Sequence, residues 1–175
     1  MLESDADVGP SQTSSPPAFD IEPVSDDASL AAARILVGDY MRSLFPPRDA
    51  TAIAAVLTAL PAPYLPPAGG LWLAREGADA AAVIALQPHE STIAEIKRMY
   101  VRPASRGRGL ARALVQHAIA EARARGYHSV RLGTLTTMHS AQRLYESVGF
   151  ARIPAYRPFE FGDTVYYELT LGSTA

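Results

Sequence analysis

A glycine-rich turn at residues 106–109 constrains the fold more than any other feature, because it separates a strand pattern from a helical one. Residues 92–101 before the turn form a strand pattern, and residues 110–126 after it carry apolar side chains at helical spacing. Another strand pattern follows at residues 129–135. Strand, helix and strand in this order predict a right-handed parallel crossover. Ligands of open α/β sheets bind where such a crossover begins, so the turn is the first candidate for a site.

The remaining sequence predicts a mixed sheet flanked by helices. The strand patterns at residues 71–76, 80–87 and 92–101 are joined by such short links that neighbouring strands are expected to be antiparallel. Further strands are expected at residues 18–24, 150–156 and 164–171, and further helices at residues 28–45, 48–60 and 138–148. Pro46 and Pro47 are expected to end the first of these helices. We therefore expect an α/β (α+β) fold with a mixed, mostly antiparallel central sheet, in the order β-α-α-β-β-β-α-β-α-β-β.

The composition is that of one globular domain. The chain has 175 residues, of which 48% are hydrophobic and 19% are charged, and these values exclude a disordered or fibrous protein. Residues 1–17 mix acids, Ser, Gly and Pro, so we expect a disordered acidic tail before a single domain at residues 18–175. The sequence shows neither a membrane helix nor a secretory signal. It has no cysteine for a disulfide or a thiolate metal site, and we expect a cytoplasmic protein.

The net charge of -2 is the balance of two regions of opposite sign. Residues 1–30 contain seven acids and no base. Residues 97–112 contain no acid and six bases, namely Lys97, Arg98, Arg102, Arg106, Arg108 and Arg112. A local positive field in a chain that is acidic overall indicates a bound anion rather than general affinity for nucleic acid.

The glycine-rich turn has the composition of a phosphate site. Gly107 and Gly109 let the backbone approach a ligand, and the helix that follows offers unpaired N–H groups and a partial positive charge. The Walker motif is excluded because no Gly-Lys-Ser/Thr follows, and the third glycine of a dinucleotide fingerprint is replaced by Arg112. From the residues alone, a phosphate or pyrophosphate site and a tight turn with solvated arginines both remain open.

The segment Arg106-Gly107-Arg108-Gly109-Leu110-Ala111 resembles the Gln/Arg-x-x-Gly-x-Gly/Ala signature of the GNAT superfamily of acyl-CoA-dependent N-acetyltransferases. Residues 95–101 look like the fourth strand of that family, and residues 141–150 resemble its Ala-x-x-Leu-Tyr-x-x-x-Gly-Phe element. The resemblance extends over residues 18–171 and implies acetyl-CoA as the acyl donor. It implies that the main chain of Met99, Tyr100 and Val101 pairs with the pantetheine arm. The amides of Arg106, Gly107, Arg108, Gly109, Leu110 and Ala111 would then hold the pyrophosphate.

The resemblance also supplies two candidates for proton transfer. Acetyl transfer needs a neutral amine, and amines are mostly protonated at pH 7. Glu95 has the register of the family's catalytic glutamate and is expected to deprotonate the amine; an anchor for a substrate cation and a partner for Lys97 or Arg98 are the alternatives. Tyr145 matches the tyrosine that gives a proton to the departing thiolate, with core packing as its alternative. A backbone N–H near Val101 would polarise the thioester carbonyl.

One position departs from the family pattern. Met138 stands where many members have Asn, so the usual Asn contact to CoA is open. His139 or Ser140 would replace that contact, or else would cap a helix or lie exposed. We expect no metal site, because the four histidines share no ligand spacing.

The resemblance implies transfer of an acetyl group from acetyl-CoA to a primary amine of a small molecule or peptide, by direct attack. A CoA-binding module without activity and an acyltransferase that uses another acyl-CoA are the alternatives. The acceptor pocket would be lined by aromatic residues of the variable segments, namely Tyr40, Tyr64, Tyr156 and Phe159, each of which could instead serve ordinary packing. No nucleic acid and no membrane are expected as partners, and a homodimer is left open.

Overall fold

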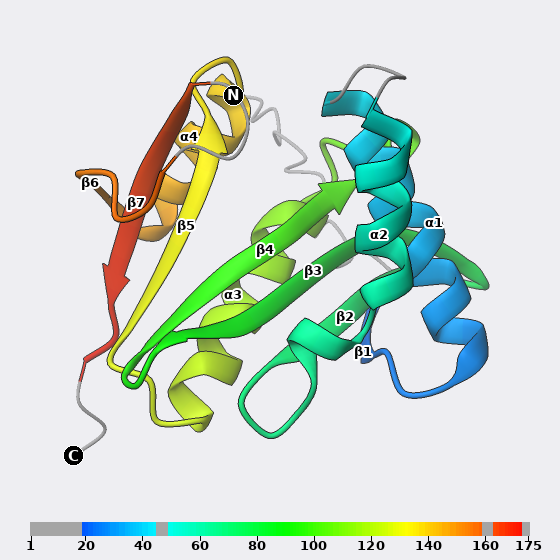
Figure 1. Ribbon diagram of the computed structural model, residues 1–175, viewed down its shortest axis with the longest axis horizontal. Helices are drawn as coiled ribbons and strands as arrows, with labels where there is room; N and C mark the ends of the chain where they lie inside the picture. The colour runs from blue at the N-terminus through cyan, green and yellow to red at the C-terminus, as the bar shows by residue number, and fades with distance from the viewer. Residues whose placement is uncertain (1–18, 45–48, 159–162, 173–175) are drawn as a thin grey trace, which may run out of the picture.

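The computed structural model describes residues 19–44, 49–158 and 163–172, which fold around one seven-stranded sheet (Figure 1). The strands are β1 (Asp20–Pro23), β2 (Gly70–Glu76), β3 (Asp79–Glu90), β4 (Ile93–Val101), β5 (Ser129–Leu135), β6 (Ala151–Ile153) and β7 (Thr164–Thr170). Their order across the sheet is β1-β2-β3-β4-β5-β7-β6. The pairing of β4 with β5 is parallel, and the other pairings between described strands are antiparallel.

Helices cover both faces of this sheet (Figure 1). Helices α1 (Asp27–Leu44) and α2 (Ala50–Ala59) lie on one face, and α3 (Leu110–Ala124) lies on the other. Helix α4 (His139–Val148) lies on the same side as α3, behind β5 and β7 in Figure 1. The short 3-10 helices η2 (Ala62–Tyr64) and η3 (Pro103–Ser105) precede β2 and α3.

The predicted order of strands and helices is confirmed, including the crossover from β4 through α3 to β5. One predicted link is wrong: β3 continues through Pro88 to Glu90, because Pro88 lies beside a register shift where its missing N–H is tolerated. β6 also ends at Ile153, earlier than predicted, because the chain after it turns to bring Tyr156 against Glu95. The predicted acidic tail at residues 1–17 and the predicted stop at Pro46 and Pro47 lie outside the described residues.

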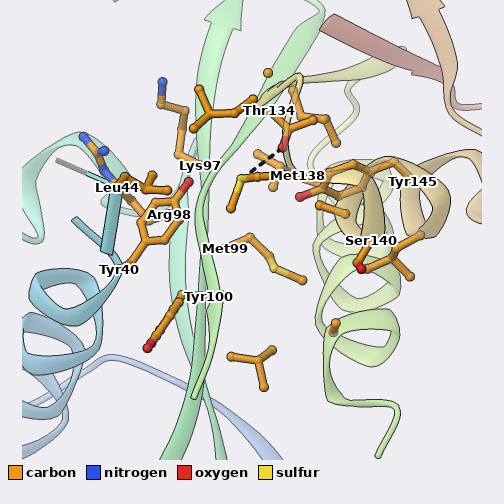
Figure 2. Close-up of a pocket in the computed structure, with 18 of the residues that line it drawn as sticks. Tyr40, Leu44, Lys97, Arg98, Met99, Tyr100, Thr134, Met138, Ser140 and Tyr145 are labelled. Carbon is orange, nitrogen blue, oxygen red and sulfur yellow. Dashed lines mark hydrogen bonds between the residues drawn. The ribbon is translucent and has the colours of Figure 1, made fainter. Parts of the chain in front are cut away.

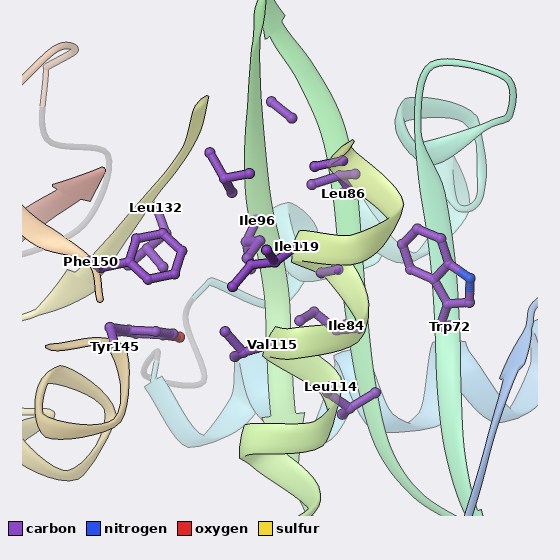
Figure 3. Close-up of a cluster of buried hydrophobic side chains, with 14 of the residues drawn as sticks. Trp72, Ile84, Leu86, Ile96, Leu114, Val115, Ile119, Leu132, Tyr145 and Phe150 are labelled. Carbon is purple, nitrogen blue, oxygen red and sulfur yellow. The ribbon is translucent and has the colours of Figure 1, made fainter. Parts of the chain in front are cut away.

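Buried apolar side chains form two clusters, one on each face of the sheet. The stripe of α3 that includes Leu114 and Ile119 packs against Ile84 of β3 (Figure 3). On the other face, Leu36 of α1 belongs to a cluster with Val83 of β3. Burying each such side chain contributes on the order of 2 kcal/mol to folding. The central strands are therefore held from both sides, and this makes them a rigid platform for a site.

The sheet opens between its two parallel strands. Only three positions of β4 and β5 are paired, namely Ile93 with Ser129, Ala94 with Val130 and Glu95 with Arg131, in the part of the chain that the structure describes. Beyond Glu95 the two strands diverge, as Figure 1 shows for the upper halves of β4 and β5. The carboxyl ends of the two strands therefore border an opening rather than a continuous sheet.

A bulge in β4 lies directly after this point. Lys97 pairs with Ala85 and Tyr100 pairs with Val83, so two residues of β4, Arg98 and Met99, lie opposite one residue of β3. Arg98 has φ 53°, in the left-handed region that residues other than glycine rarely adopt. The bulge breaks the alternation of side chains that a regular strand would impose. Figure 2 shows Lys97 and Arg98 on the same side of β4, with Met99 on the other.

Candidate active site

A cleft of about 880 Å³ occupies the opening between β4 and β5. Its walls come from residues 96–101 of β4, residues 132–135 of β5, the first turns of α4 and the end of α1. The glycine-rich turn closes one end of the cleft through Arg106, Gly107 and Gly109. The turn that the sequence singled out therefore lies at the carboxyl end of β4 and borders this cleft.

The conformation of this turn depends on its two glycines. Gly107 has φ 77° and Gly109 has φ 85°, and a Cβ at either residue would meet no atom within 4 Å. The reason for glycine here is therefore backbone conformation and not space. The first intrahelical acceptor is the carbonyl of Gly109, which takes the amide of Ala113. The amides of the first turn of α3 before Ala113 have no partner within the helix, as an anion site requires.

Glu76, at the end of β2, holds the turn in place. Its Oε2 accepts hydrogen bonds of 2.8 Å from Ser105 Oγ and from Arg108 Nη2. Arg106 donates from Nε to the carbonyl of Val101 at 3.1 Å, and its guanidinium lies 6.0 Å from the ring centre of Tyr100. Sequence reasoning missed Glu76, because nothing in the sequence indicates that the end of β2 lies beside the turn after β4.

The predicted pantetheine residues Met99, Tyr100 and Val101 all line the cleft. From Ile96 onward no residue of β4 is paired with β5, so one edge of the strand faces the opening. An unpaired strand edge presents backbone N–H and C=O groups that must find partners. The edge is therefore suited to an extended ligand with amide groups.

Tyr145 reaches from α4 toward β4, across the cleft (Figure 2). Its ring packs edge-on against Phe150, with the ring centres 5.9 Å apart, and against Tyr167 at 6.3 Å. Burial raises the pKa of the Tyr145 phenol well above its usual value, and the nearby Tyr40 adds to this shift. Tyr145 thus belongs both to the core and to the cleft wall, and it holds its proton at neutral pH.

Glu95 is fully buried at the point where β4 and β5 separate, and it is not among the residues that line the cleft. Arg157 forms a two-pronged pair with it, with Nη2 at 2.8 Å from Oε1 and Nη1 at 3.2 Å from Oε2. Tyr156 donates to Oε1 at 2.7 Å, and Gln87 donates to Oε2 at 3.0 Å. Lys97 Nζ lies 3.9 Å from Oε2. Both carboxylate oxygens are therefore occupied by donors from three different segments of the chain.

Met138, which stands where many members of the family have Asn, also lies at the cleft with the two residues that follow it. Met138, His139 and Ser140 line it at the start of α4, and His139 and Ser140 are exposed. Met138 Sδ lies 3.5 Å from Thr134 Oγ1 (Figure 2), and Ser140 Oγ accepts from Arg143 at 3.2 Å. Helix α4 has no side-chain cap at its first turn. Neither His139 nor Ser140 caps the helix, so both side chains are available to a ligand.

The predicted aromatic residues of the acceptor pocket occupy different places. Tyr40 lines the cleft, with its ring centre 5.8 Å from that of Tyr100. Tyr64 is buried, and its hydroxyl accepts from Arg98 Nε at 3.2 Å. Tyr156 contacts Glu95 and lies outside the cleft lining. Phe159 lies outside the described residues.

The cleft has a strongly positive lining. Within residues 19–44, 49–158 and 163–172, it contains no carboxylate and five basic side chains, namely Lys97, Arg98, Arg106, Arg143 and Arg157. A cavity lined by one sign of charge concentrates ligands of the opposite sign. The same residues contain no group of three or more His, Asp or Glu side chains placed to hold a metal ion. No described helix has the length and apolar character needed to cross a membrane.

Comparison with known proteins agrees with this geometry. The model of the acetyltransferase (GNAT) family matches residues 35–150 of the chain. An N-acetyltransferase of Schizosaccharomyces pombe is 38% identical over 110 residues, which cover 62% of this chain and 68% of that protein. N-acetylaspartate synthetase of Danio rerio is 36% identical over 92 residues, covering 51% of this chain but 33% of the synthetase.

Two solved structures show the same fold over nearly the whole chain. An acetyltransferase from Streptococcus agalactiae has a TM-score of 0.75 at 22% identity, covering 88% of this chain and 99% of its own. An acetyltransferase from Salmonella typhimurium, solved with acetyl-CoA, has a TM-score of 0.67 at 21% identity and covers 90% of this chain and 96% of its own. The fold predicted from the sequence is confirmed by these likenesses.

Proposed function

The chain belongs to the acetyltransferase (GNAT) family, and we propose from this that its cleft joins acetyl-CoA to a small amine that enters from the side of α1. The activity is that of an acetyl-CoA-dependent N-acetyltransferase, as the sequence predicts. The main support for this function is the opening between β4 and β5. It connects the amides at the N-terminus of α3 with the side chains of β4 that lie on the side of α1.

The donor half of the cleft is the side that faces α3 and α4. We place the pyrophosphate at the amides of residues 106–111, where Gly107 and Gly109 bend the backbone toward the ligand. The pantetheine arm would follow the edge of β4 that is not paired with β5, from Val101 to Met99, where its amides meet backbone groups of the strand. This placement brings the thioester to the side of β4 on which Met99 and Tyr145 both lie (Figure 2). His139 and Ser140 directly follow Met138 in the chain and line the cleft, and we propose them as substitutes for the Asn contact to CoA.

The reaction that this placement supports is a direct attack. The nitrogen lone pair of the amine forms a bond to the thioester carbonyl carbon, and the bond from carbon to sulfur breaks. The thiolate that leaves takes a proton, for which Tyr145 is the donor in our proposal, since burial keeps its phenol protonated. The nitrogen loses its extra proton to water, and water returns a proton to the Tyr145 phenolate, so that the protons balance over one turnover. A backbone N–H near Val101 would stabilise the carbonyl oxygen as it gains charge.

The amine must reach the thioester in its neutral form, and the charge of the cleft favours this form. A positive lining lowers the pKa of a bound ammonium group, because the charged form is repelled. The sequence offers three roles for Glu95: a base, an anchor for a substrate cation, and a partner for Lys97 or Arg98. Its enclosure by Arg157, Tyr156 and Gln87 supports a role as a partner of the protein's own cations, so we propose that Glu95 positions the cations of the acceptor side.

The relatives support an acceptor of low molecular weight. N-acetylaspartate synthetase is similar to about half of this chain, and its name gives an acetylated amino acid as the product of that protein. We propose that this chain likewise acetylates the amino group of a small molecule, with no nucleic acid, membrane or metal involved. The cytoplasmic location and the disordered tail at residues 1–17 stay predictions. An inactive CoA-binding module is less favoured because Tyr145 stands in the cleft wall.

Release of free thiol tests the proposal. The full chain is incubated with acetyl-CoA and a panel of amines, and free CoA is measured against a reaction without amine. We expect thiol release with at least one small amine and the acetylated amine as its product by mass spectrometry. Tight acetyl-CoA binding without turnover on any amine would overturn the enzymatic role, and faster turnover with propionyl-CoA or succinyl-CoA would overturn the choice of donor.

A further inference from the structure

We propose that the acceptor amine carries a carboxylate and that Arg98 binds it. This inference rests on the proposed function and deepens it, because it names the chemical class of the acceptor. Arg98 lies at a bulge of β4, contacts uncharged groups and has further cations beside it in the cleft.

The bulge in β4 delivers Arg98 to the acceptor side of the cleft. In a regular strand Lys97 and Arg98 would point to opposite faces of the sheet. Figure 2 instead shows both on the side of α1, next to Tyr40 and Leu44, while Met99 faces Tyr145. The left-handed φ of 53° at Arg98 is strained for an arginine. Backbone strain of this kind persists where the surrounding structure enforces it, and it is concentrated at functional sites.

The described contacts of Arg98 are with uncharged groups. Its Nε donates to the Tyr64 hydroxyl at 3.2 Å, and its Nη1 lies 3.4 Å from Met41 Sδ. No carboxylate of the described chain lies within salt-bridge distance of its guanidinium. The side chain is half-buried in the cleft wall, so part of its hydration is lost. A guanidinium in such a place is stabilised by a planar anion, and its fork of donors matches a carboxylate.

The cations next to Arg98 also favour an acceptor that carries a carboxylate. Lys97 and Arg157 line the cleft, and both pair with Glu95. Among the described residues, Arg98, Lys97 and Arg157 bring three positive charges to the cleft lining, and Glu95 pairs with the last two, so these four side chains carry a net formal charge of +2. An acceptor that brings only ammonium groups, such as a polyamine, would be repelled from this side. An acceptor that brings a carboxylate with its amine neutralises part of the charge.

The positions along β4 also fix how the acceptor lies. Arg98 and Met99 are neighbours in the chain but face opposite sides of the strand (Figure 2). If the thioester lies beside Met99, an amine that attacks it and a carboxylate that meets Arg98 are separated by about the width of the strand. The two groups therefore belong to one small molecule, in the way that an amino acid carries both. Tyr40 and Tyr100 pack against each other with their ring centres 5.8 Å apart and line the cleft, so their rings offer apolar contact to the carbon chain.

A series of matched acceptors tests the inference. Each common amino acid, together with β-alanine and 4-aminobutyrate, is assayed with acetyl-CoA beside its carboxamide, and spermidine and O-phosphoethanolamine are added. The amide of an α-amino acid has a less basic amine than the acid, so intrinsic reactivity at neutral pH favours the amide. We expect the reverse here, with kcat/KM at least tenfold higher for the acid of the best pair.

The possible failures are separable. Faster turnover of carboxamides or of spermidine would overturn the carboxylate while leaving the acetyltransferase function intact. Preference for O-phosphoethanolamine would overturn it in favour of a phosphate group. Absence of thiol release with every amine would count against both the proposed function and the inference.

Variants of Arg98 locate the binding group. We expect Arg98→Asn to raise KM for the best carboxylate acceptor at least tenfold and to leave its carboxamide and the affinity for acetyl-CoA unchanged. Asparagine suits this test because it tolerates a left-handed φ. Arg98→Lys should restore part of the affinity. Arg123→Gln is the matched control, since it removes one positive charge from an exposed position of α3 outside the cleft. An unchanged ratio of acid to amide in Arg98→Asn would overturn the proposal.

Discussion

The hydroxyl of Tyr156 donates a 2.7 Å hydrogen bond to Oε1 of Glu95, and so ties the chain after β6 to the point where β4 and β5 separate. Arg157 closes on the same carboxylate. Burial and the Glu95 carboxylate raise the pKa of the Tyr156 phenol, so the phenol remains a donor at neutral pH. Neither Glu95 nor Tyr156 lines the cleft, but their hydrogen bond holds one side of the cleft in place.

The first prediction concerns Glu95→Gln. We expect the variant to lose about 1–3 kcal/mol of folding free energy, because the Arg157 guanidinium keeps a neutral partner in place of a charged one. We expect kcat/KM to rise with pH as the substrate amine deprotonates, in the variant as in the parent. Denaturant unfolding and a pH profile measure the two effects. Glu90→Gln is the control, because Glu90 is an exposed partner of Arg131 and such pairs contribute about 1 kcal/mol or less.

A different outcome for this variant would support the role as a base. Loss of a general base lowers turnover by about 10² to 10⁴. A loss of that size, together with a pH profile that no longer follows the amine, would assign proton abstraction to Glu95.

The second prediction concerns Tyr145→Phe. The ring can keep its contacts with Phe150 and Tyr167, so we expect little change in stability. We expect kcat to fall about 10²-fold, the lower end of the range for general acid catalysis, with acetyl-CoA affinity unchanged. Tyr167→Phe is a matched control: it removes a buried hydroxyl that donates to Glu146 at 3.0 Å, away from the cleft. Equal kcat losses in both variants would contradict the role of Tyr145.

The third prediction concerns pH. An ordinary phenol ionises near pH 10 and then no longer donates a proton. Burial raises the pKa of Tyr145, so the protonated form persists to higher pH and the acid remains available. We therefore expect kcat to stay level through about pH 10, where an unshifted tyrosine would be half ionised. A fall in kcat centred near that pH, measured with saturating acceptor, would show that the phenol is not shifted or not the donor.

The fourth prediction concerns the glycines of the turn. Alanine at Gly107 or Gly109 is strained by about 1–2 kcal/mol, because both residues have positive φ. We expect each variant to weaken acetyl-CoA binding by tenfold or more, as measured by calorimetry. Gly126→Ala imposes the same kind of strain at φ 80° after the end of α3, away from the cleft. It should lower stability and leave the affinity unchanged, and a comparable loss of affinity there would mean that strain acts globally.

The fifth prediction concerns Glu76→Gln. Removing a negative charge near a phosphate site would strengthen anion binding if electrostatics alone decided the outcome. Glu76 also holds Ser105 and Arg108, so the variant loosens the turn. We expect the affinity for acetyl-CoA to fall several-fold, and the direction of the change separates the two effects. Glu22→Gln, at an acid of β1 that pairs with Arg75, serves as the control for charge.

Local patterns predicted most of this architecture. The helical spacing of Leu110, Leu114 and Ile119 and the glycines before them reflect local physics, and the observed α3 starts where they indicate. The short links between β2, β3 and β4 likewise determine their antiparallel pairing. These features depend on neighbours in the chain, so a single sequence contains them.

Contacts between distant segments could not be predicted in the same way. The enclosure of Glu95 depends on Arg157, 62 residues later, and the support of the turn depends on Glu76, about 30 residues earlier. Neither residue belongs to a motif. The bulge at Arg98 was also hidden, because alternation predicts one side chain per face and no residue near Arg98 marks the irregularity. The acceptor side of the cleft rests on these contacts, and a single sequence does not contain them.

The separated strands have a further consequence for the behaviour of the protein in solution. An unpaired strand edge on a protein surface recruits edges of other molecules and promotes aggregation. Here the unpaired edges of β4 and β5 face each other inside the molecule, with α1 and α4 contributing to the walls beside them. A second β-strand that approached from solvent would have to enter between these helices. The molecule thereby keeps backbone groups available to a slender ligand while withholding them from other protein chains.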